Sequence, residues 1–316
     1  MMAAMTRPED TEITLALGSQ RAVVSPWGAS LRRYFHLEAK GGETDIVWGY
    51  SGGANKKGGQ GDVLIPFPGR IAEGAYQFAG HRYQLERNDK EGPNAIHGFV
   101  RGMLWNIHAE SAAHISFTIR LETKEYEPRG YPFSLAIVVT YALEKRGLAC
   151  IFSIRNTGLG TAPVAAGFHP YFTVGTPAID EAEAKIPGSH YLEFNNLVPT
   201  GKVVSVDGTE WDFRQSRRVG SSRLNYCYMD LQRDDDGLAR ACLRNPDTGR
   251  TITVTMDRSF TAIVVYTGDA IRDAARQALA IEPMTCATDA FNHPEWGLKR
   301  LGSEEEFTGR YEISVG

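Results

Sequence analysis

The sequence predicts an all-β fold, a large antiparallel sandwich of many short strands with few, short helices. Stretches in which apolar and polar residues alternate recur along the chain, and clusters of Gly, Pro, Asn and Asp separate them. Alternation with a period of two gives a strand one apolar and one polar face, and such clusters are typical of turns. Many strands with little helical periodicity favour a sandwich over an alternating α/β fold.

The clearest strand is expected in residues 114–123, where Ile115, Phe117 and Ile119 share one face. Residues 270–279 are the most helix-like stretch, and they are short enough to form only a turn or a loop. Further strands are expected, some with looser alternation, in residues 134–143, 149–154, 251–256 and 260–266.

One domain is expected over residues 13–316, preceded by a flexible N-terminus at residues 1–12, because no linker divides the chain. Residues 52–61 are rich in Gly and Lys and are interpreted as a flexible loop. This segment lacks the Gly-Lys-Ser/Thr ending of a phosphate-binding loop, so it does not indicate a nucleotide site.

Composition narrows the class of protein. The 316 residues are 42% hydrophobic and 23% charged, with a formal net charge of -4, which gives no reason to expect nucleic acid or an anionic membrane as a partner. The four cysteines show no Cys-x-x-Cys spacing and are expected to be reduced. With no signal-peptide pattern and no apolar run of about 18 residues, we expect a cytoplasmic protein.

Two distant segments carry groups that can transfer protons. His169 lies in Gly-Phe-His-Pro-Tyr-Phe at residues 167–172, and Glu282 lies in Ile-Glu-Pro-Met-Thr at residues 281–285. Histidine gives or takes a proton near neutral pH, and a glutamate takes one when its surroundings raise its pKa. Each residue alone also fits a structural role. Together they would allow acid–base chemistry on a neutral substrate without a cofactor.

A series of motifs in a fixed order makes the functional interpretation of His169 and Glu282 more specific. The chain resembles the aldose 1-epimerase (galactose mutarotase-like) family, which implies a β-supersandwich fold. The resemblance runs through most of the chain and rests on Gly28–Ala29, Arg-Ile-Ala at 70–72, Asn-x-x-His-Gly at 94–98, Gly-Tyr-Pro-Phe at 130–133, the His169 segment, Pro-Thr-Gly at 199–201, Tyr-Thr-Gly at 266–268 and the Glu282 segment.

The resemblance also implies a reaction and its residues. Family members interconvert the α and β anomers of an aldose. The catalytic base falls on Glu282 and the catalytic acid on His169, and His97 and Arg70 fall on sugar contacts. A protonated His97 or Arg70 would stabilise charge that develops on the sugar oxygens. The implied partner is a small sugar, and neither a metal nor another cofactor is required.

Three positions depart from the family pattern and leave the sugar open. Gly69 stands where the family often has Asn, Asn225 aligns with a sugar-binding Asp, and Val264 aligns with a Gln. Asn225 still forms hydrogen bonds but carries no charge, and the nearby Asp230 is out of register. Galactose or glucose is the default substrate, and a deoxy, sulfated or phosphorylated sugar is the alternative. A phosphosugar would need a cluster of basic residues near the site, and Arg32–Arg33 and Arg217–Arg218 are basic pairs that the sequence cannot place.

Other classes of function remain open from the sequence. A non-catalytic sugar-binding or regulatory protein would keep the fold, but binding alone does not need a matched proton donor and acceptor. A glycoside hydrolase needs two carboxylates about 5–9.5 Å apart, and the motifs supply one. A metal site would have to use His97 and His169, which lack the close spacing of known ligand motifs. The oligomeric state is not indicated.

Overall fold

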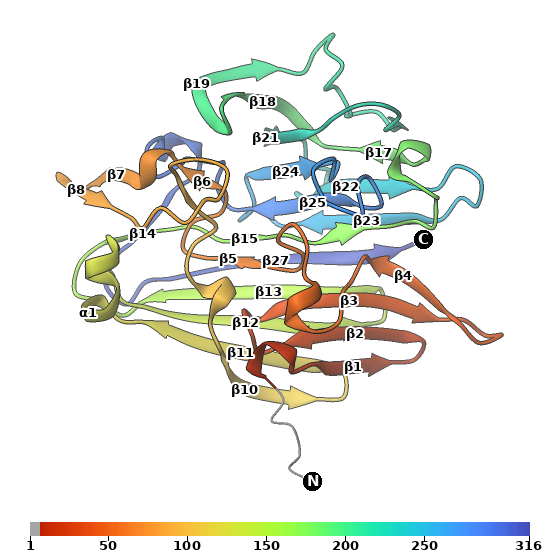
Figure 1. Cartoon of the computed structure of the whole chain (residues 1–316), viewed down its shortest axis with the longest axis horizontal. Coiled ribbons are helices and arrows are strands. Elements are labelled where there is room, and N and C mark those ends of the chain that lie inside the picture. Colours follow the sequence, from red (N-terminus) through yellow and green to blue (C-terminus); the bar gives the residue numbers. More distant parts are fainter. Residues whose placement is uncertain (1–6) are drawn as a thin grey trace.

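The computed structural model describes residues 7–316 and contains two large antiparallel sheets (Figure 1). The order of strands in the first sheet interleaves distant parts of the chain, because β4 pairs with β16 and not with β5. In order, this sheet contains β1 (Ile13–Leu17), β2 (Gln20–Ser25), β3 (Ser30–Leu37), β4 (Glu43–Val47), β16 (Tyr171–Phe172), β25 (Leu279–Met284), β24 (Ala262–Tyr266), β21 (Asn225–Leu231), β18 (Gly188–Asn195) and β19 (Val198–Ser205). Off this path, β15 (Gly167–Phe168) pairs with β25, and β5 (Val63–Leu64) pairs with β15.

The second sheet is built largely from the longest alternating segments. Along β12 every second residue is buried, as the sequence pattern predicts for a strand with one face in the core. In order, this sheet contains β10 (Asn106–Ser111), β11 (His114–Leu121), β12 (Leu135–Glu144), β13 (Gly147–Asn156), β27 (Glu306–Val315), β23 (Thr251–Met256), β22 (Ala239–Arg244), β17 (Glu183–Lys185) and β20 (Arg217–Arg218).

The remaining elements are short. Three two-stranded ribbons pair β6 (Arg70–Ile71) with β9 (Ala95–Ile96), β7 (Ala75–Phe78) with β8 (His81–Gln84), and β14 (Ala162–Val164) with β26 (Lys299–Leu301). Within residues 7–316, α1 (Thr123–Tyr126) is the one α-helix, and 3-10 turns occupy Pro8–Asp10, Gly53–Asn55, Ala72–Gly74, Val100–Gly102, Glu127–Arg129, Ile179–Glu181 and Pro294–Trp296. In this part of the chain no helix is long and apolar enough to cross a membrane.

These elements confirm the predicted all-β class. Each predicted strand segment contains a strand, and residues 270–278 form turns, which was one of the two expectations for that stretch. Residues 1–6 of the expected flexible N-terminus lie outside the described residues. Residues 7–12 contact the body, since Glu12 pairs with Arg32 at 2.9 Å. One domain over residues 13–316 stays a prediction, and a hydrophobic cluster that includes residues of both sheets supports it.

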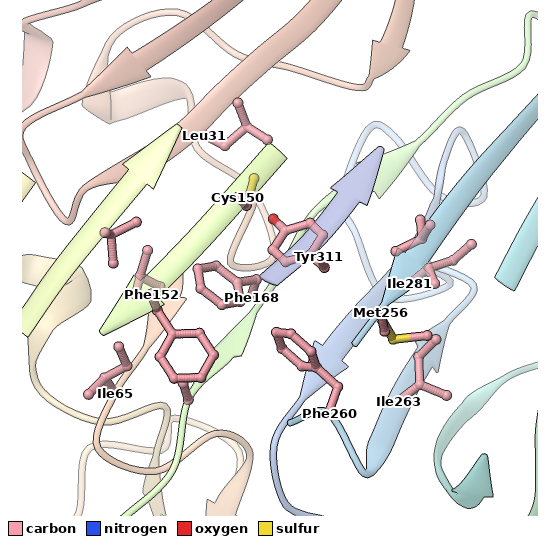
Figure 2. Packing of buried hydrophobic residues seen from close by; sticks show 14 of the residues in the cluster. Leu31, Ile65, Cys150, Phe152, Phe168, Met256, Phe260, Ile263, Ile281 and Tyr311 are labelled. Atoms are coloured by element: carbon pink, nitrogen blue, oxygen red, sulfur yellow. The ribbon is translucent and has the colours of Figure 1, made fainter. Parts of the chain in front are cut away.

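The core lies between the two sheets and decides which way β25 faces. Figure 2 shows Ile281 and Ile263 of the first sheet near Met256 and Tyr311 of the second. Because neighbouring side chains of a strand point to opposite faces, Glu282 points away from this core. It therefore lies on the outer face of the first sheet, together with its lateral neighbour Val264.

Candidate active site

Strand register brings the two proton-transfer residues together. Gly167 pairs with Met284, and Tyr171 pairs with Ala280 in the same antiparallel register. Between these two pairs, His169 falls directly opposite Glu282. Antiparallel residues that lie opposite each other have side chains on the same face of the sheet, so the pairing of two motifs far apart in the sequence creates the His–Glu contact.

The two side chains meet in a buried position. Nε2 of His169 lies 3.4 Å from Oε1 of Glu282, and the side chains are 8% and 3% exposed. Nδ1 of His169 and Oε2 of Glu282 are buried and have no hydrogen-bond partner in the structure. Since buried polar atoms are nearly always paired, two unpaired atoms in adjoining residues mark this position as a candidate for contact with a polar ligand.

A ribbon of two short strands carries His97 and Arg70. Arg70 of β6 pairs with Ile96 of β9, which directly precedes His97. The backbone N–H of Gly69 donates to Nδ1 of His97 at 3.2 Å, so a neutral His97 carries its proton on Nε2. The rings of His97 and His169 lie edge to face with centroids 5.7 Å apart.

Arg70 is held by two acidic residues. Its Nε donates to Asp89 at 2.7 Å, and its Nη2 donates to Glu91 at 2.6 Å. These ion pairs hold the guanidinium at the wall of the cleft with Nη1 left over for a ligand. Asn225, the first residue of β21, is exposed at the same cleft.

The five residues selected from the sequence all line one cleft of about 930 Å³ on the outer face of the first sheet. These residues are Arg70, His97, His169, Asn225 and Glu282. The cleft is not lined by Arg32–Arg33 or by Arg217–Arg218. Asp230 also lies outside it. The basic pairs considered for a phosphosugar therefore lie elsewhere.

Burial shifts the pKa values of the site in opposite directions. Loss of solvent raises the pKa of Glu282 well above its ordinary value, and the charge of Arg70 opposes this only partly. Loss of solvent lowers the pKa of His169, and the charges of Lys56 and Arg101 lower it further. The pKa of His97 is also lowered, first by burial and then by His169. Burial favours a neutral His97, in contrast to the protonated form considered from the sequence.

Residues 57–59 of the segment 52–61, which was interpreted from the sequence as a flexible loop, form part of the site. Gly58 and Gly59 line the cleft, and a Cβ atom on Gly59 would lie 3.1 Å from the ring of His169. The hydroxyl of Tyr171 donates to the carbonyl of Gly58 at 2.7 Å, while its ring stacks on His169 with centroids 5.1 Å apart. Glycine at 59, with a φ of +78°, allows this close approach.

A buried charge network behind His169 was also not identified from the sequence. Asp62 is 1% exposed, is in an ion pair with Lys56 and lies 3.6 Å from Arg101, which lines the cleft. The backbone N–H of His169 donates to the carbonyl of Asp62 at 3.0 Å. This network connects the loop, the imidazole and the wall of the cleft. Spacing in the sequence gives no signal for it.

Within residues 7–316, no group of three or more His, Cys, Asp or Glu residues is arranged to hold a metal ion. Two of the carboxylates that line the cleft, Asp89 and Glu91, are paired with Arg70.

Comparison with known proteins decides the family. The family model for aldose 1-epimerase matches residues 11–314. The chain belongs to the aldose 1-epimerase family. A galactose mutarotase of Pongo abelii is 31% identical over 210 residues, which is 63% of this chain and 59% of that protein. A maltose epimerase of Levilactobacillus brevis is 27% identical over 315 residues, 90% of this chain and 88% of that protein.

Solved structures agree on the fold. A GalM/aldose epimerase homologue from C. elegans superposes with a TM-score of 0.84 at 20% identity, covering 97% of this chain and 98% of the other. This similarity confirms the galactose mutarotase-like fold that the motifs implied.

Two of the three positions that depart from the aldose 1-epimerase pattern, Gly69 and Val264, line the cleft close to the candidate catalytic residues. Gly69 has a φ of +68°, and a Cβ atom there would lie 2.6 Å from Oγ1 of Thr288. The Thr288 side chain therefore fills the space in which a larger residue at position 69 would begin. Val264 lies directly opposite Glu282 and lines the cleft with an apolar side chain.

Proposed function

We propose that this protein is an aldose 1-epimerase that interconverts α and β anomers, with Glu282 as the base and His169 as the acid. The observation that carries the proposal is the buried contact of 3.4 Å between Nε2 of His169 and Oε1 of Glu282, at a cleft wide enough for a sugar. Each side chain also retains a buried polar atom without a partner.

The reaction needs two proton transfers and one bond cleavage. The carboxylate of Glu282 accepts the proton of the anomeric hydroxyl, and the imidazolium of His169 donates a proton to the ring oxygen O5. The C1–O5 bond breaks to give an open-chain aldehyde. Rotation about C1–C2 presents the other face of the carbonyl. Ring closure then reverses both transfers and forms the other anomer.

The pair needs only one transferable proton for this cycle. Ring opening starts with that proton on His169 and ends with a proton on Glu282 and a neutral His169. The opposite pKa shifts favour the latter, uncharged state in the empty site. In this state Glu282 carries the proton, as it does when the sugar is the open-chain aldehyde. Direct transfer of this proton from Glu282 to His169 across the 3.4 Å contact gives the charged pair with which ring opening starts. The shared proton therefore need not come from solvent.

The sugar contacts are proposed for the groups that surround this pair. Nε2–H of a neutral His97 can donate to a sugar oxygen, because Gly69 already occupies Nδ1. Arg70 can use its remaining Nη1, and Asn225 can both donate and accept. The names of the two relatives, a galactose mutarotase and a maltose epimerase, support an aldose substrate of one or two rings.

Anomer exchange measured by NMR on the wild-type protein tests the proposal. Freshly dissolved galactose, glucose, maltose and lactose are mixed with the protein, and the interconversion rate is compared with that in buffer. His169→Asn is expected to reduce the acceleration about 10²-fold or more, the usual contribution of a proton-transfer group. If no sugar interconverts faster than in buffer, the protein is not an epimerase for these aldoses and the sugar-binding alternative is favoured.

A further inference from the structure

The cleft is larger than one hexose requires. A hexose has about a dozen non-hydrogen atoms, so it occupies less than about 360 Å³ even if each atom takes the ~30 Å³ of a liquid water. The cleft measures about 930 Å³. A second pocket of about 290 Å³ adjoins it and shares six lining residues with it: Arg70, Phe194, Leu197, Arg223, Asn225 and Tyr226.

Strand order places the β18 side of this second pocket beyond the reach of a single ring. Glu282 of β25 lies opposite Val264 of β24, which lies opposite Cys227 of β21, and β18 is the next strand. At about 4.8 Å a strand, β18 is about 14 Å from β25. A pyranose built from bonds of about 1.5 Å measures about 5–6 Å from O1 to O4. With its anomeric carbon at Glu282, one hexose therefore ends before β18.

The tip of the β18–β19 hairpin supplies an apolar wall at that distance. Asn196 and Leu197 form the two-residue turn, with φ values of +48° and +70°. Such turns favour Gly at the second position, and a left-handed Leu costs roughly 1–2 kcal/mol. A strained bulky residue that lines a cleft is a common sign of a binding role. Phe194, also partly exposed, lines the same pocket. Figure 1 shows this hairpin at the upper edge of the molecule, beyond β21.

The two arginines of the second pocket differ in how they are paired. Arg70 is paired with Asp89 and Glu91, whereas Arg223 is 85% exposed and lies 3.8 Å from Asp269, which pairs more closely with Arg276 at 3.0 Å. Glu193, the acidic residue of this pocket, is paired with Lys202 at 3.1 Å. Arg70 is thus neutralised, and a single, largely solvent-exposed Arg223 is not the compact basic cluster that a phosphate or sulfate group would need. Apolar side chains with a few polar groups around them match instead the C–H faces and hydroxyls of a neutral sugar ring.

We propose that the pocket formed by Phe194, Leu197, Tyr226 and Asn225 binds a second sugar ring, so that the preferred substrate is a reducing disaccharide. The reducing ring lies over Glu282 and His169, and the second ring, linked through a hydroxyl distant from C1, lies against the β18–β19 hairpin. This inference rests on the proposed epimerase function and adds the size and neutral character of the substrate.

Comparison of kcat/KM for disaccharides and monosaccharides tests the inference. Maltose, cellobiose, lactose and melibiose are measured against glucose by NMR anomer exchange. We expect at least one disaccharide to exceed glucose about tenfold, the upper range for contact with an aromatic side chain. If glucose is interconverted and every disaccharide is equal or slower, the second subsite is overturned while the epimerase function stands.

Variants of the hairpin tip locate the effect. Leu197→Asn removes the apolar side chain but keeps a residue that tolerates a positive φ, so the turn is retained. It is expected to lower kcat/KM for the preferred disaccharide at least threefold more than for glucose, and Phe194→Ala is expected to act in the same direction. Val203→Ala on β19, outside both pockets, is the matched control and should change neither value. Equal effects of Leu197→Asn on both sugars would overturn the inference.

Calorimetry separates this inference from the epimerase proposal if no sugar is interconverted. Tighter binding of a disaccharide than of glucose, weakened by Leu197→Asn, would uphold the second subsite and reject the reaction. Equal affinities, or no binding of either sugar, would overturn the subsite as well.

Discussion

At the scale of residues, the site depends on two groups that burial drives away from their ordinary protonation. Glu282 gains basicity from loss of solvent, and His169 becomes harder to protonate for the same reason. Because they lie 3.4 Å apart, the proton that one loses is available to the other. The pair is best described as one acid–base unit with coupled titration.

The pH profile should reveal this coupling. Adding a second proton to the pair requires a pH below the ordinary imidazole range, and removing the single proton requires a pH above the ordinary carboxyl range. We therefore expect kcat/KM, corrected for spontaneous exchange, to show no fall as the pH drops through the ordinary imidazole pKa of 6.5. A fall by half near the ordinary imidazole pKa of 6.5 would show that His169 titrates like an exposed histidine.

Glu282→Gln should stabilise the fold at neutral pH. The folded-state pKa of Glu282 is raised above its unfolded value, so the folded protein loses stability as the pH rises from about 4.5 through that pKa. A neutral amide avoids this cost, and we expect a Tm higher by about 2 °C or more at pH 7. Below the unfolded pKa the carboxyl is neutral in both states, so the difference should vanish at about pH 4. A lower Tm for the variant at pH 7 would contradict the raised pKa.

At the scale of elements, the loop 57–59 holds the acid in place. Tyr171 stacks on His169 and donates to Gly58, and Gly59 lies against the imidazole. A methyl group on Gly59 would approach the ring to 3.1 Å, so either the loop or His169 must shift. Because proton transfer requires a narrow geometry, this shift should affect turnover more than binding.

Gly59→Ala is expected to lower kcat about tenfold or more with a smaller change in KM. Gly80→Ala provides a matched control, since Gly80 also has a left-handed φ, +81°, and a methyl group there would meet no atom within 4 Å. Both variants carry the backbone cost of roughly 1–2 kcal/mol, which thermal unfolding measures. Equal kcat values for the two variants would show that the loop does not position His169.

The sequence predicts individual strands well but not their pairing. Alternation marks β11, β12 and β23 because each has one face in the core. β25 is buried along its whole length, so its residues show no alternation that would predict which way Glu282 points. The contact with His169 depends on the register of segments more than a hundred residues apart, which local patterns do not encode. The family resemblance, not periodicity, indicated that these residues meet.

At the scale of the whole molecule, packing between the two sheets provides the support on which the cleft is built. Phe152 contacts the rings of Phe168, Phe260 and Phe307, with centroids 5.2–6.2 Å apart. Phe168 directly precedes His169, so the core on one face of the sheet is one residue from the acid on the other. The loop at residues 57–59 and the charge network at Asp62 could not be predicted, because tertiary contacts and not sequence spacing bring them to the site.

Phe152→Ala should destabilise the protein by about 3–5 kcal/mol, the usual cost of removing a buried phenyl ring. Chemical denaturation with urea measures this difference. Leu159→Ala, at a fully exposed side chain, is the control and should lie within about 0.5 kcal/mol of wild type. A cost below about 1 kcal/mol for Phe152→Ala would contradict the close packing between the sheets.

The central claim is that Glu282 removes the anomeric proton, and Glu282→Gln in NMR anomer exchange tests it most directly. The variant keeps the shape of the side chain but cannot accept the proton, so the acceleration should fall about 10²-fold or more while sugar affinity by calorimetry changes little. Asp230→Asn, the same change at an exposed carboxylate outside the cleft, should behave like wild type. Acceleration by Glu282→Gln equal to that of wild type would contradict the account.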